Sequence, residues 1–375
     1  MTPRRVAAVG WAIVLGGGGS VAITVAGRRA RFLGQAAVAA QALVPWSALA
    51  AWPVVVATTL GSPRRTPLGT TGTIVGAAGL VIAARTAGRP RIAASSTADR
   101  VVRGRLARSG TPARNELAAA ASSTADRVVR GRLARSGTPA RNELAAAASS
   151  TEALSIANVN LLYLNAKMAR GVPVLRKLDA DVLTFCEYTP AHADDLVAGL
   201  AERYPHRIDR PGPVAHGTAL WSRFPLTEVY ARPLQHERIT ADVTTPHGFT
   251  VRVLVVHTVS PPTKVGPWRA ELALLAAESP PADRPAVMIG DFNASWNHPE
   301  LRAIVASGWR SAHRDWGRGL SPSWPADRWY PPFVRIDHAL VNDQVSVVAI
   351  EDFGLPGSDH RGLVVTVAPA RRAAP

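Results

Sequence analysis

The sequence contains a single cysteine, Cys186, among its 375 residues, so no disulfide can form within the chain. Cys186 ends the apolar run 182–186. A thiol in such a run is usually a buried and unreactive packing residue, so we predict no chemical role for it. The lack of disulfides does not by itself indicate a cellular compartment.

Acidic residues are absent from residues 1–91, which contain ten arginines. Residues 94–147 contain ten arginines and four acidic residues, whereas residues 148–375 contain 23 basic and 23 acidic residues. The formal net charge of +16 therefore belongs to the N-terminal part of the chain. A basic surface is the usual electrostatic sign of a nucleic-acid-binding protein. The total charge gives no such sign for the C-terminal part, although a local basic patch stays open.

Charged residues are also absent from three apolar stretches, which we predict to be transmembrane helices at about residues 6–26, 32–60 and 67–84. A helix needs about 20 apolar residues to cross a bilayer, and glycine is tolerated in such helices. Two other interpretations stay open: a signal peptide at the first stretch, or two spans followed by an interfacial segment. Because two more apolar stretches follow the first, we prefer a membrane region of three helices over residues 1–91.

Three helices predict a multi-pass protein of the cell membrane whose two ends lie on opposite sides. The arginines near the predicted helices are slightly more numerous on the side of the C-terminal domain. By the positive-inside rule, this count favours a cytoplasmic domain. The family resemblance described below suggests the opposite, and we predict an extracytoplasmic domain.

Residues 92–152 form a segment in which a 27-residue unit occurs twice, so that residues 93–124 are identical to residues 120–151. Fixed-period repeats often form solenoids, but two units with so few apolar residues cannot bury a core. The exact identity indicates a recent duplication. We predict a basic, helical and solvated linker. Contact of this segment with anionic lipid headgroups is the functional alternative.

Residues 153–370 have the composition of a globular α/β domain. Strands are predicted where apolar residues alternate or run together, and helices where they recur at helical spacing. The predicted strands cover residues 154–164, 181–186, 217–221, 237–244, 249–256, 286–289, 335–341, 345–353 and 363–367. The predicted helices cover residues 172–178, 191–203, 267–278 and 298–306. This mixture of hairpins and crossovers favours two mixed sheets that pack together, with helices outside.

Polar side chains recur where the predicted strands end, which is where α/β proteins build their sites. The central stretch is Gly290-Asp291-Phe292-Asn293-Ala294, directly after the apolar run 286–289. Side chains two residues apart on a strand point the same way, so Asp291 and Asn293 are predicted to act together on a hard metal ion and a phosphate oxygen. Similar groups follow other strands: Asn160, Glu187, His257, Asp337, Asp359 and His360. Any one of them could be a turn or packing residue, but together they predict an active site.

The order of these groups resembles the endonuclease/exonuclease/phosphatase superfamily over residues 155–368. The pattern is Asn, then Glu after an apolar strand, then His, Gly-Asp-Phe-Asn, Arg-Ile-Asp and Ser-Asp-His. The resemblance implies a four-layer α/β sandwich. The sequence is most similar to membrane-anchored bacterial members of the teicoplanin-resistance type, with which it shares three N-terminal spans, the segments 160–163 and 217–225, and Trp324-Pro325. It departs from them in the duplicated linker and in Cys186, where Gln is usual.

The resemblance also implies a metal site and a base. Glu187 would bind Mg²⁺ or Mn²⁺, with Asn160 and Asp359 nearby. His360 would be the general base that activates water, and Asp337 would orient its ring.

The same resemblance implies the groups that handle water and phosphate. Asp291 would position the attacking water, and Asn293 would hold a phosphate oxygen. His257 would stabilise the phosphate or protonate the leaving group. The structural alternative for Asp337 is an ion pair with Arg335. Three other histidines are predicted to be packing or surface residues: His298, His313 and His338.

Three functions are compatible with these residues. We predict a membrane-anchored phosphohydrolase of a lipid-linked phosphate or pyrophosphate, because the domain is neutral and the spans would hold it near lipid headgroups. The alternative is a membrane-tethered, DNase I-like nuclease with nucleic acid as its partner, which requires a basic groove and stacking aromatics. Five tryptophans could stack bases, fill a core or line a lipid-facing rim: Trp296, Trp309, Trp316, Trp324 and Trp329. The complete set of site residues disfavours a third function, a binding module with a decayed site.

Overall fold

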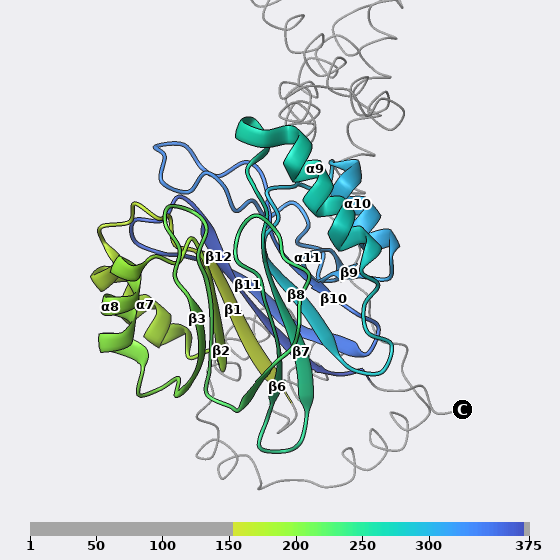
Figure 1. The fold of residues 1–375 in the computed structure, drawn as a ribbon, viewed down its shortest axis with the longest axis horizontal. Coiled ribbons are helices and arrows are strands. Elements are labelled where there is room, and N and C mark those ends of the chain that lie inside the picture. The colour runs from red at the N-terminus through yellow and green to blue at the C-terminus, as the bar shows by residue number, and fades with distance from the viewer. Residues whose placement is uncertain (1–152, 371–375) are drawn as a thin grey trace, which may run out of the picture.

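The computed structural model describes residues 153–370, and Figure 1 shows two β-sheets with helices on their outer sides. The predicted membrane helices and the repeated linker lie outside the described residues. Within residues 153–370, no helix is both long enough and apolar enough to cross a membrane.

Each sheet contains six strands. The strands of the first sheet are β1 (Leu154–Asn160), β2 (Val182–Cys186), β3 (His206–Arg210), β4 (Thr218–Ser222), β11 (Val345–Gly354) and β12 (Arg361–Pro369). Those of the second are β5 (Leu226–Glu228), β6 (Ile239–Thr244), β7 (Thr250–His257), β8 (Ala286–Asp291), β9 (Arg310–Ser311) and β10 (Asp337–Val341). The strand orders are β11-β12-β1-β2-β4-β3 and β5-β6-β7-β8-β10-β9. Each sheet has one parallel pair, β1 with β2 and β7 with β8, among antiparallel neighbours.

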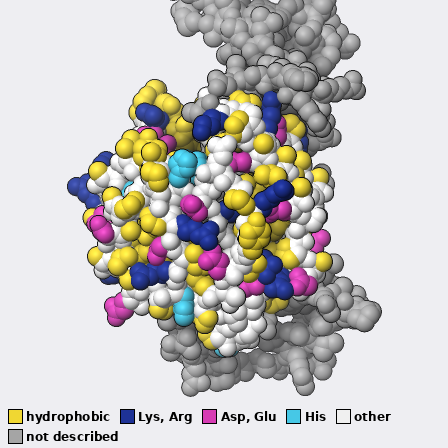
Figure 2. Space-filling view, in the orientation of Figure 1, with side chains coloured by type: hydrophobic (Ala, Val, Ile, Leu, Met, Phe, Trp, Pro, Cys, Tyr) yellow, Lys and Arg dark blue, Asp and Glu magenta, His cyan; other side chains and the backbone are white. Residues whose placement is uncertain are grey.

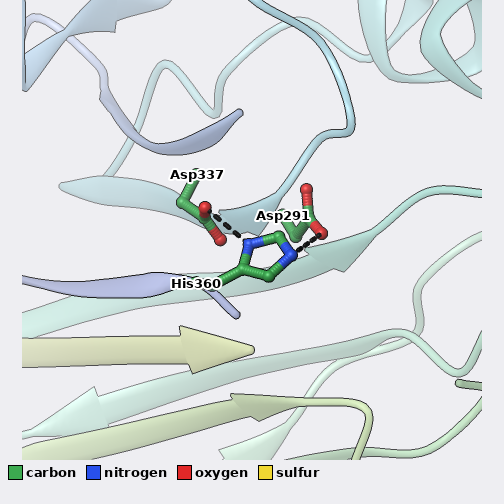
Figure 3. Close-up of side chains that lie close together, drawn as sticks. All are labelled: Asp291, Asp337 and His360. Atoms are coloured by element: carbon green, nitrogen blue, oxygen red, sulfur yellow. Dashed lines mark hydrogen bonds and ion pairs between the residues drawn. The ribbon is translucent and has the colours of Figure 1, made fainter. Parts of the chain in front are cut away.

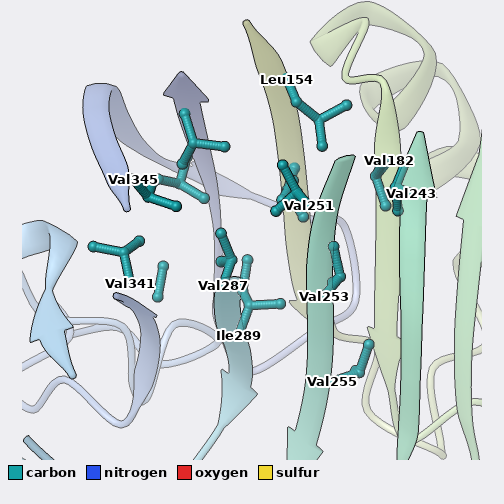
Figure 4. Packing of buried hydrophobic residues seen from close by; sticks show 14 of the residues in the cluster. Leu154, Val182, Val243, Val251, Val253, Val255, Val287, Ile289, Val341 and Val345 are labelled. Carbon is teal, nitrogen blue, oxygen red and sulfur yellow. The ribbon is translucent and has the colours of Figure 1, made fainter. Parts of the chain in front are cut away.

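Alternation of side chains along the strands builds separate cores on the two faces of each sheet. On β8, Val287 and Ile289 point into the core between the sheets, where side chains from both sheets meet (Figure 4). Ala286 and Met288 point the other way, toward the outer helices. A slip of one residue would exchange these two sets, so burial on both faces determines the register.

Two helices cover each sheet. The helices α7 (Met168–Leu178) and α8 (Pro190–Leu200) pack on the first sheet, and α9 (Pro261–Ala277) and α10 (Pro299–Ala306) pack on the second. A short helix, α11 (Ala312–Asp315), precedes a long loop. The predicted arrangement of two mixed sheets with helices outside is therefore confirmed.

Most predicted elements are present, but several boundaries differ. The first strand was predicted to reach residue 164 and ends at Asn160, because Leu162 adopts a left-handed conformation with φ of 60°. The helix predicted from residue 267 corresponds to the part of α9 that follows a break at Lys264, whose backbone is not helical; a short helical turn that begins at Pro261 precedes the break and was not predicted. Four elements are missing from the prediction: β3, β5, β9 and α11. The first of these, His-Arg-Ile-Asp-Arg, is an edge strand with charged side chains and no apolar alternation to indicate it.

The central strands bring their ends to one edge of the molecule, near the top of the described part in Figure 1, where α9 begins. Asn160 pairs with Cys186 across the parallel strands β1 and β2. Asp291 pairs with His257 on one side and with Asp337 on the other. This register places residues that are far apart in the sequence side by side.

Gly290 makes the close approach between β7 and β8 possible. Its φ is 148°, and a Cβ atom at this position would lie 1.8 Å from the carbonyl oxygen of Val256. Because this atom belongs to the backbone of a central strand, it cannot move away cheaply. The glycine of the Gly-Asp-Phe-Asn stretch is thus a packing requirement that puts Asp291 in place.

We expect Gly290→Ala to lower the free energy of unfolding by at least about 1–3 kcal/mol, because it combines a backbone clash with an unfavourable φ. Chemical unfolding followed by tryptophan fluorescence measures this change. Gly354→Ala is the matched control, because a Cβ there has no heavy atom within 4 Å. Equal unfolding midpoints for the two variants would contradict the proposed clash.

His298, His313 and His338 are buried and hydrogen-bonded within the fold, as predicted. His298 Nδ1 accepts the Ser295 N–H at 2.8 Å. His338 Nε2 lies 2.8 Å from the carbonyl oxygen of Ala294, and His313 Nε2 lies 3.2 Å from Asp352. Burial, followed by the charge of Arg335, lowers the pKa of His338 to about 3 and that of His313 to about 4. Both rings are therefore neutral at physiological pH.

These lowered pKa values predict that the fold loses stability in mild acid. The histidines bind protons below pH 6.5 when unfolded but not when folded, so stability is complete above this pH and falls as the pH drops toward 4. Each histidine contributes a slope of up to about 1.4 kcal/mol per pH unit. We expect His338→Gln to reduce the slope of unfolding free energy against pH by this amount. His247→Gln, at an exposed histidine, is the control; an unchanged slope in His338→Gln would refute the assignment.

Candidate active site

The imidazole of His360 lies between two buried carboxylates (Figure 3). Its Nδ1 atom is hydrogen-bonded to Asp337 Oδ2 at 2.9 Å, and its Nε2 atom lies 3.8 Å from Asp291 Oδ2. The carboxylates come from β10 and β8, where they occupy paired positions, and His360 directly precedes β12. The contact with Asp337 therefore fixes the ring so that Nε2 faces Asp291.

The charges of this cluster change the pKa values of its members. Burial, followed by the charge of Asp337, raises the pKa of Asp291 to about 7. Burial lowers the pKa of His360, but Asp337 and Asp291 outweigh this effect and raise it to about 10. The site thus holds a carboxyl group that titrates near neutral pH beside a ring that is protonated there. Such perturbed groups in contact are typical of active sites.

Asn160 connects this cluster to Glu187. Its side-chain Nδ2 donates to Glu187 Oε1 at 2.9 Å and to Asp291 Oδ2 at 3.2 Å. Its Oδ1 accepts the N–H of Leu162 at 3.0 Å, and the N–H of Tyr163 donates to Glu187 Oε2 at 2.9 Å. The turn after β1 therefore holds both oxygens of Glu187 and orients the amide that reaches Asp291.

Glu187 has a left-handed backbone, with φ of 56° directly after β2. This conformation costs a residue other than glycine about 1–3 kcal/mol and recurs at functional sites. Hydrogen bonds on both sides hold it, from Leu161 N–H to the Cys186 carbonyl at 2.9 Å and from Tyr188 N–H to the Gly217 carbonyl at 3.0 Å. The strained turn directs the Glu187 side chain toward Asn160.

Asn293 also has a positive φ, of 48°, which asparagine adopts more readily than most residues. Its backbone N–H donates to Asp291 Oδ1 at 2.8 Å, and its Nδ2 donates to the Thr258 carbonyl at 2.9 Å. The predicted pair Asp291 and Asn293 is thus one local unit, and the amide of Asn293 stays half-exposed beside the buried carboxylate.

His257 approaches Asp291 from the side opposite Asp337. Its Nε2 lies 3.8 Å from Asp291 Oδ2, and its ring contacts the ring of His236, tilted by 44° with centroids 4.3 Å apart. His236 contacts the exposed His216 in turn, with centroids 4.9 Å apart. Burial, followed by the neighbouring His236 and His360, holds the pKa of His257 well below its usual range. His257 is therefore a neutral imidazole at physiological pH.

Asp359 lies at the edge of the cluster and is linked to a tryptophan. Its Oδ1 lies 3.9 Å from His360 Nε2, and its Oδ2 accepts the indole N–H of Trp324 at 3.0 Å. The preceding Ser358 donates to the Asn160 carbonyl at 2.6 Å and accepts the His360 N–H at 3.0 Å. This hydroxyl ties the end of β1 to the segment that carries His360.

The structure joins all eight predicted site residues into one network of contacts centred on Asp291. Their assigned chemical roles stay predictions. The structural alternative for Asp337 is wrong, because the Arg335 guanidinium pairs with Asp352 at 2.8 Å and reaches only the backbone carbonyl of Asp337. The sequence analysis assigned no supporting role to six residues that hold the network: Tyr163, His216, His236, Thr258, Trp324 and Ser358. Most of them act through backbone atoms or lie in loops, so spacing along the chain gives no signal for them.

The fold and the site can now be compared with known proteins. The family model described as "Endonuclease/Exonuclease/phosphatase family" matches residues 157–360, more than half of the chain. The chain belongs to this family. The predicted superfamily is confirmed, whereas the membrane-anchored teicoplanin-resistance type stays a prediction. A search of curated proteins finds no match.

Several solved structures are similar to part of this chain at low sequence identity. Humanized D. rerio TDP2 is 18% identical with a TM-score of 0.49, over 58% of this chain and 99% of that chain. An endonuclease/exonuclease/phosphatase from Beutenbergia cavernae is 19% identical with a TM-score of 0.46, over 60% of this chain and 74% of that chain. The 3′ phosphatase NExo from Neisseria, solved with a product DNA hairpin, is 17% identical with a TM-score of 0.44, over 56% of this chain and 98% of that chain.

The residues present suit a divalent cation. One ligand atom from each of Asp291, Asp337 and His360 lies within 4.8 Å of the others. Asp337 Oδ1 is buried without a hydrogen-bond partner. Glu187 is half-buried and lies one amide away from Asp291. Carboxylate oxygens gathered in this way are the ligands that Mg²⁺ and Mn²⁺ prefer. Asp291, Asp337 and His360 are therefore a second set of candidate metal ligands, beside the predicted set of Glu187, Asn160 and Asp359.

We expect Asp337→Asn to lower the pKa of His360 in the metal-free protein by roughly 1–3 units, because the ring loses a negative charge at 2.9 Å. NMR titration of the histidine ring protons measures the shift. Asp283→Asn, at an exposed carboxylate in the loop before β8, is the control and leaves the titration unchanged. A pKa near 10 in Asp337→Asn would show that Asp337 does not set the charge of the ring.

Proposed function

We propose that the chain is a metal-dependent phosphohydrolase that uses water to cleave a phosphoester or pyrophosphate bond of a lipid-linked substrate. The observation that carries the proposal is the imidazole of His360 held between Asp337 and Asp291. Membership of the family supports hydrolysis of phosphodiester bonds as the class of reaction.

In the proposed reaction, water attacks phosphorus in line with the bond that breaks. His360 Nε2 takes a proton from the water while Asp337 holds the ring through Nδ1. Asp291 positions the water: its Oδ2 lies 3.8 Å from His360 Nε2, longer than a hydrogen bond, so the two groups can share a small polar molecule. The water oxygen becomes bonded to phosphorus, and the leaving oxygen departs with the electron pair of the broken bond and takes a proton from solvent. His360 then releases to solvent the proton that it took from the attacking water.

Glu187 would hold Mg²⁺ or Mn²⁺, with Asn160 and Asp359 nearby. When bound, the cation supplies positive charge that polarises a phosphate oxygen and offsets the carboxylates. The pKa of His360 would then fall from about 10 toward the range in which the ring accepts a proton. Binding of the cation would therefore determine how readily His360 can act as the base.

His257 and Asn293 would bind the phosphate. Because His257 is neutral, it can donate an N–H to a phosphate oxygen but is a weak source of a full proton. Its low pKa therefore favours phosphate stabilisation over protonation of the leaving group, the two roles implied by the resemblance. Asn293, a half-buried residue, is the second group for a phosphate oxygen, and its Nδ2 would turn from the Thr258 carbonyl and Asp291 to donate to it.

Two features of the sequence support a lipid-linked substrate. Residues 148–375 have equal numbers of basic and acidic residues, so no overall positive charge attracts a polyanion. The three apolar stretches of residues 1–91 would hold the domain at a membrane, which raises its effective concentration toward lipid headgroups. We accordingly propose a multi-pass cell-membrane protein whose catalytic domain faces out of the cytoplasm.

A two-substrate assay tests this function. The purified full chain with Mg²⁺ is offered a polyprenyl pyrophosphate and, separately, plasmid DNA. We expect phosphate release from the lipid without nicking of the DNA, and loss of release on chelation of the metal. His360→Ala should reduce kcat/KM by about 10²–10⁴-fold, because it removes the base. Glu187→Gln should raise the Mg²⁺ concentration that is required.

Glu202→Gln, at an exposed carboxylate just after α8, is the control for loss of a charge and should keep full activity. Nicking of DNA without phosphate release would replace the proposal with the nuclease. Activity that survives both His360→Ala and Asp291→Ala would remove the assigned site.

A further inference from the structure

Exposed apolar side chains gather at the edge of the molecule that carries the site. Among residues 153–370, five large hydrophobic side chains are exposed, and four of them lie in loops at this edge: Leu164 (71%), Val214 (54%), Tyr230 (87%) and Trp329 (96%). The fifth, Val197 (42%), lies on α8. We call the four residues the apolar rim. Figure 2 shows hydrophobic side chains gathered at the upper left of the domain, close to an exposed histidine.

The topology explains why four separate loops share one edge. Leu164 lies in the loop after β1, and Val214 lies between β3 and β4, at the end of β4 that neighbours the end of β2. Tyr230 lies between β5 and β6, at the end of β6 that neighbours the end of β7, and Trp329 lies in the loop before β10. The strands that carry the site residues end at this same edge. The apolar rim therefore lies at the same edge of the domain as the site.

The loop residues 316–336 connect the most exposed rim residue to the site through aromatic contacts. Trp329 contacts Tyr330, with ring centroids 5.4 Å apart, and Tyr330 stacks on Phe333 at 6.0 Å. Phe333 contacts Trp324 at 6.2 Å, and the Trp324 indole donates to Asp359. Trp329 is thus held by a packed row that begins at a site carboxylate, although its own ring is almost fully in solvent.

The charges of the four loops do not form a basic groove. Four of their arginines are engaged in ion pairs with carboxylates: Arg238, Arg318, Arg328 and Arg335. The remaining basic side chains of these loops are Lys167 and Arg232, and Lys264 at the start of α9 and Arg361 directly after His360 also lie at this edge. Binding to a nucleic acid depends chiefly on many lysine and arginine contacts with phosphates, and four such residues are few for that purpose.

We propose that the apolar rim inserts into the surface of a phospholipid bilayer, so that the site opens directly onto the lipid headgroups. Protruding tryptophan and tyrosine rings suit the boundary between headgroups and acyl chains, because each has an apolar body and one polar atom. Single side chains at the tips of four loops can enter a fluid surface, whereas they form no groove for a peptide. This inference deepens the proposed function, because it names the surface that presents a lipid-borne phosphate.

Fluorescent labels on single cysteines test the insertion in the full chain. The variants are Leu164→Cys, Tyr230→Cys and Trp329→Cys, each with an environment-sensitive fluorophore, and the native Cys186 is fully buried. Val197→Cys is the matched control, because it is an exposed apolar residue away from the rim. The protein is placed in phosphatidylcholine vesicles, with or without brominated acyl chains, in metal-free buffer.

We expect the rim labels to shift to shorter emission wavelengths and to be quenched by the brominated lipid, while the label at position 197 stays accessible to aqueous iodide. The shift should persist at high salt, because insertion is apolar. Rim labels that are as accessible to iodide as the control, or a shift that high salt abolishes, would overturn the proposal. A shift with duplex DNA in place of vesicles would assign the rim to a nucleic acid instead.

The labelling measurement involves no turnover, so it can succeed or fail independently of the proposed function. Inserted rim labels together with an inactive enzyme would remove the hydrolase and keep the bilayer surface. Lipid hydrolysis by a protein whose rim labels stay exposed to solvent would keep the proposed hydrolase and remove the proposed bilayer surface.

Discussion

The site depends on buried negative charge that is not paired with a lysine or arginine. Within the described domain, the ion pairs of Asp291 and Asp337 are with histidines alone. Burying carboxylates in this way costs stability, and the cost appears as the raised pKa of Asp291. The raised pKa of His360 records the opposite effect, the attraction of both carboxylates for its protonated ring. A cluster of this kind attracts a cation or a proton. The proposed chemistry uses both, with a divalent ion beside Glu187 and a proton that moves through His360.

The packing of the two sheets offsets this cost and holds the buried carboxylates and His360 in fixed positions. Register between β8 and β10 places Asp291 opposite Asp337, and at Gly290 the strand β8 approaches the backbone of Val256 on β7 too closely for any side chain. Beyond the site, Asp352 collects Arg335 and His313 in a buried network, which keeps that guanidinium away from the Asp337 carboxylate. A neighbouring arginine would neutralise the carboxylate and remove its effect on the base.

Much of the architecture follows from the sequence, because burial on both faces of the central strands leaves clear apolar runs. The order of polar residues at strand ends was enough to predict the family, and the residues that it singled out lie together in the structure. The contacts and distances between these residues could not be predicted from the sequence. The left-handed turn at Glu187 has no sequence signal, since glutamate rarely adopts it. The row from His257 through His236 to His216 depends on the packing of two loops, and β3 carries too many charged residues to be recognised as a strand.

The side-chain amide of Asn160 makes the site depend on contact between the two sheets. Asn160 and Glu187 belong to the first sheet and Asp291 to the second, so a single side chain bridges the interface between the two halves of the sandwich. The site therefore exists only while the two sheets are docked against each other. Loosening of the core between them would inactivate the protein before either sheet unravelled, so catalytic activity would be a more sensitive gauge of sheet docking than any probe of secondary structure.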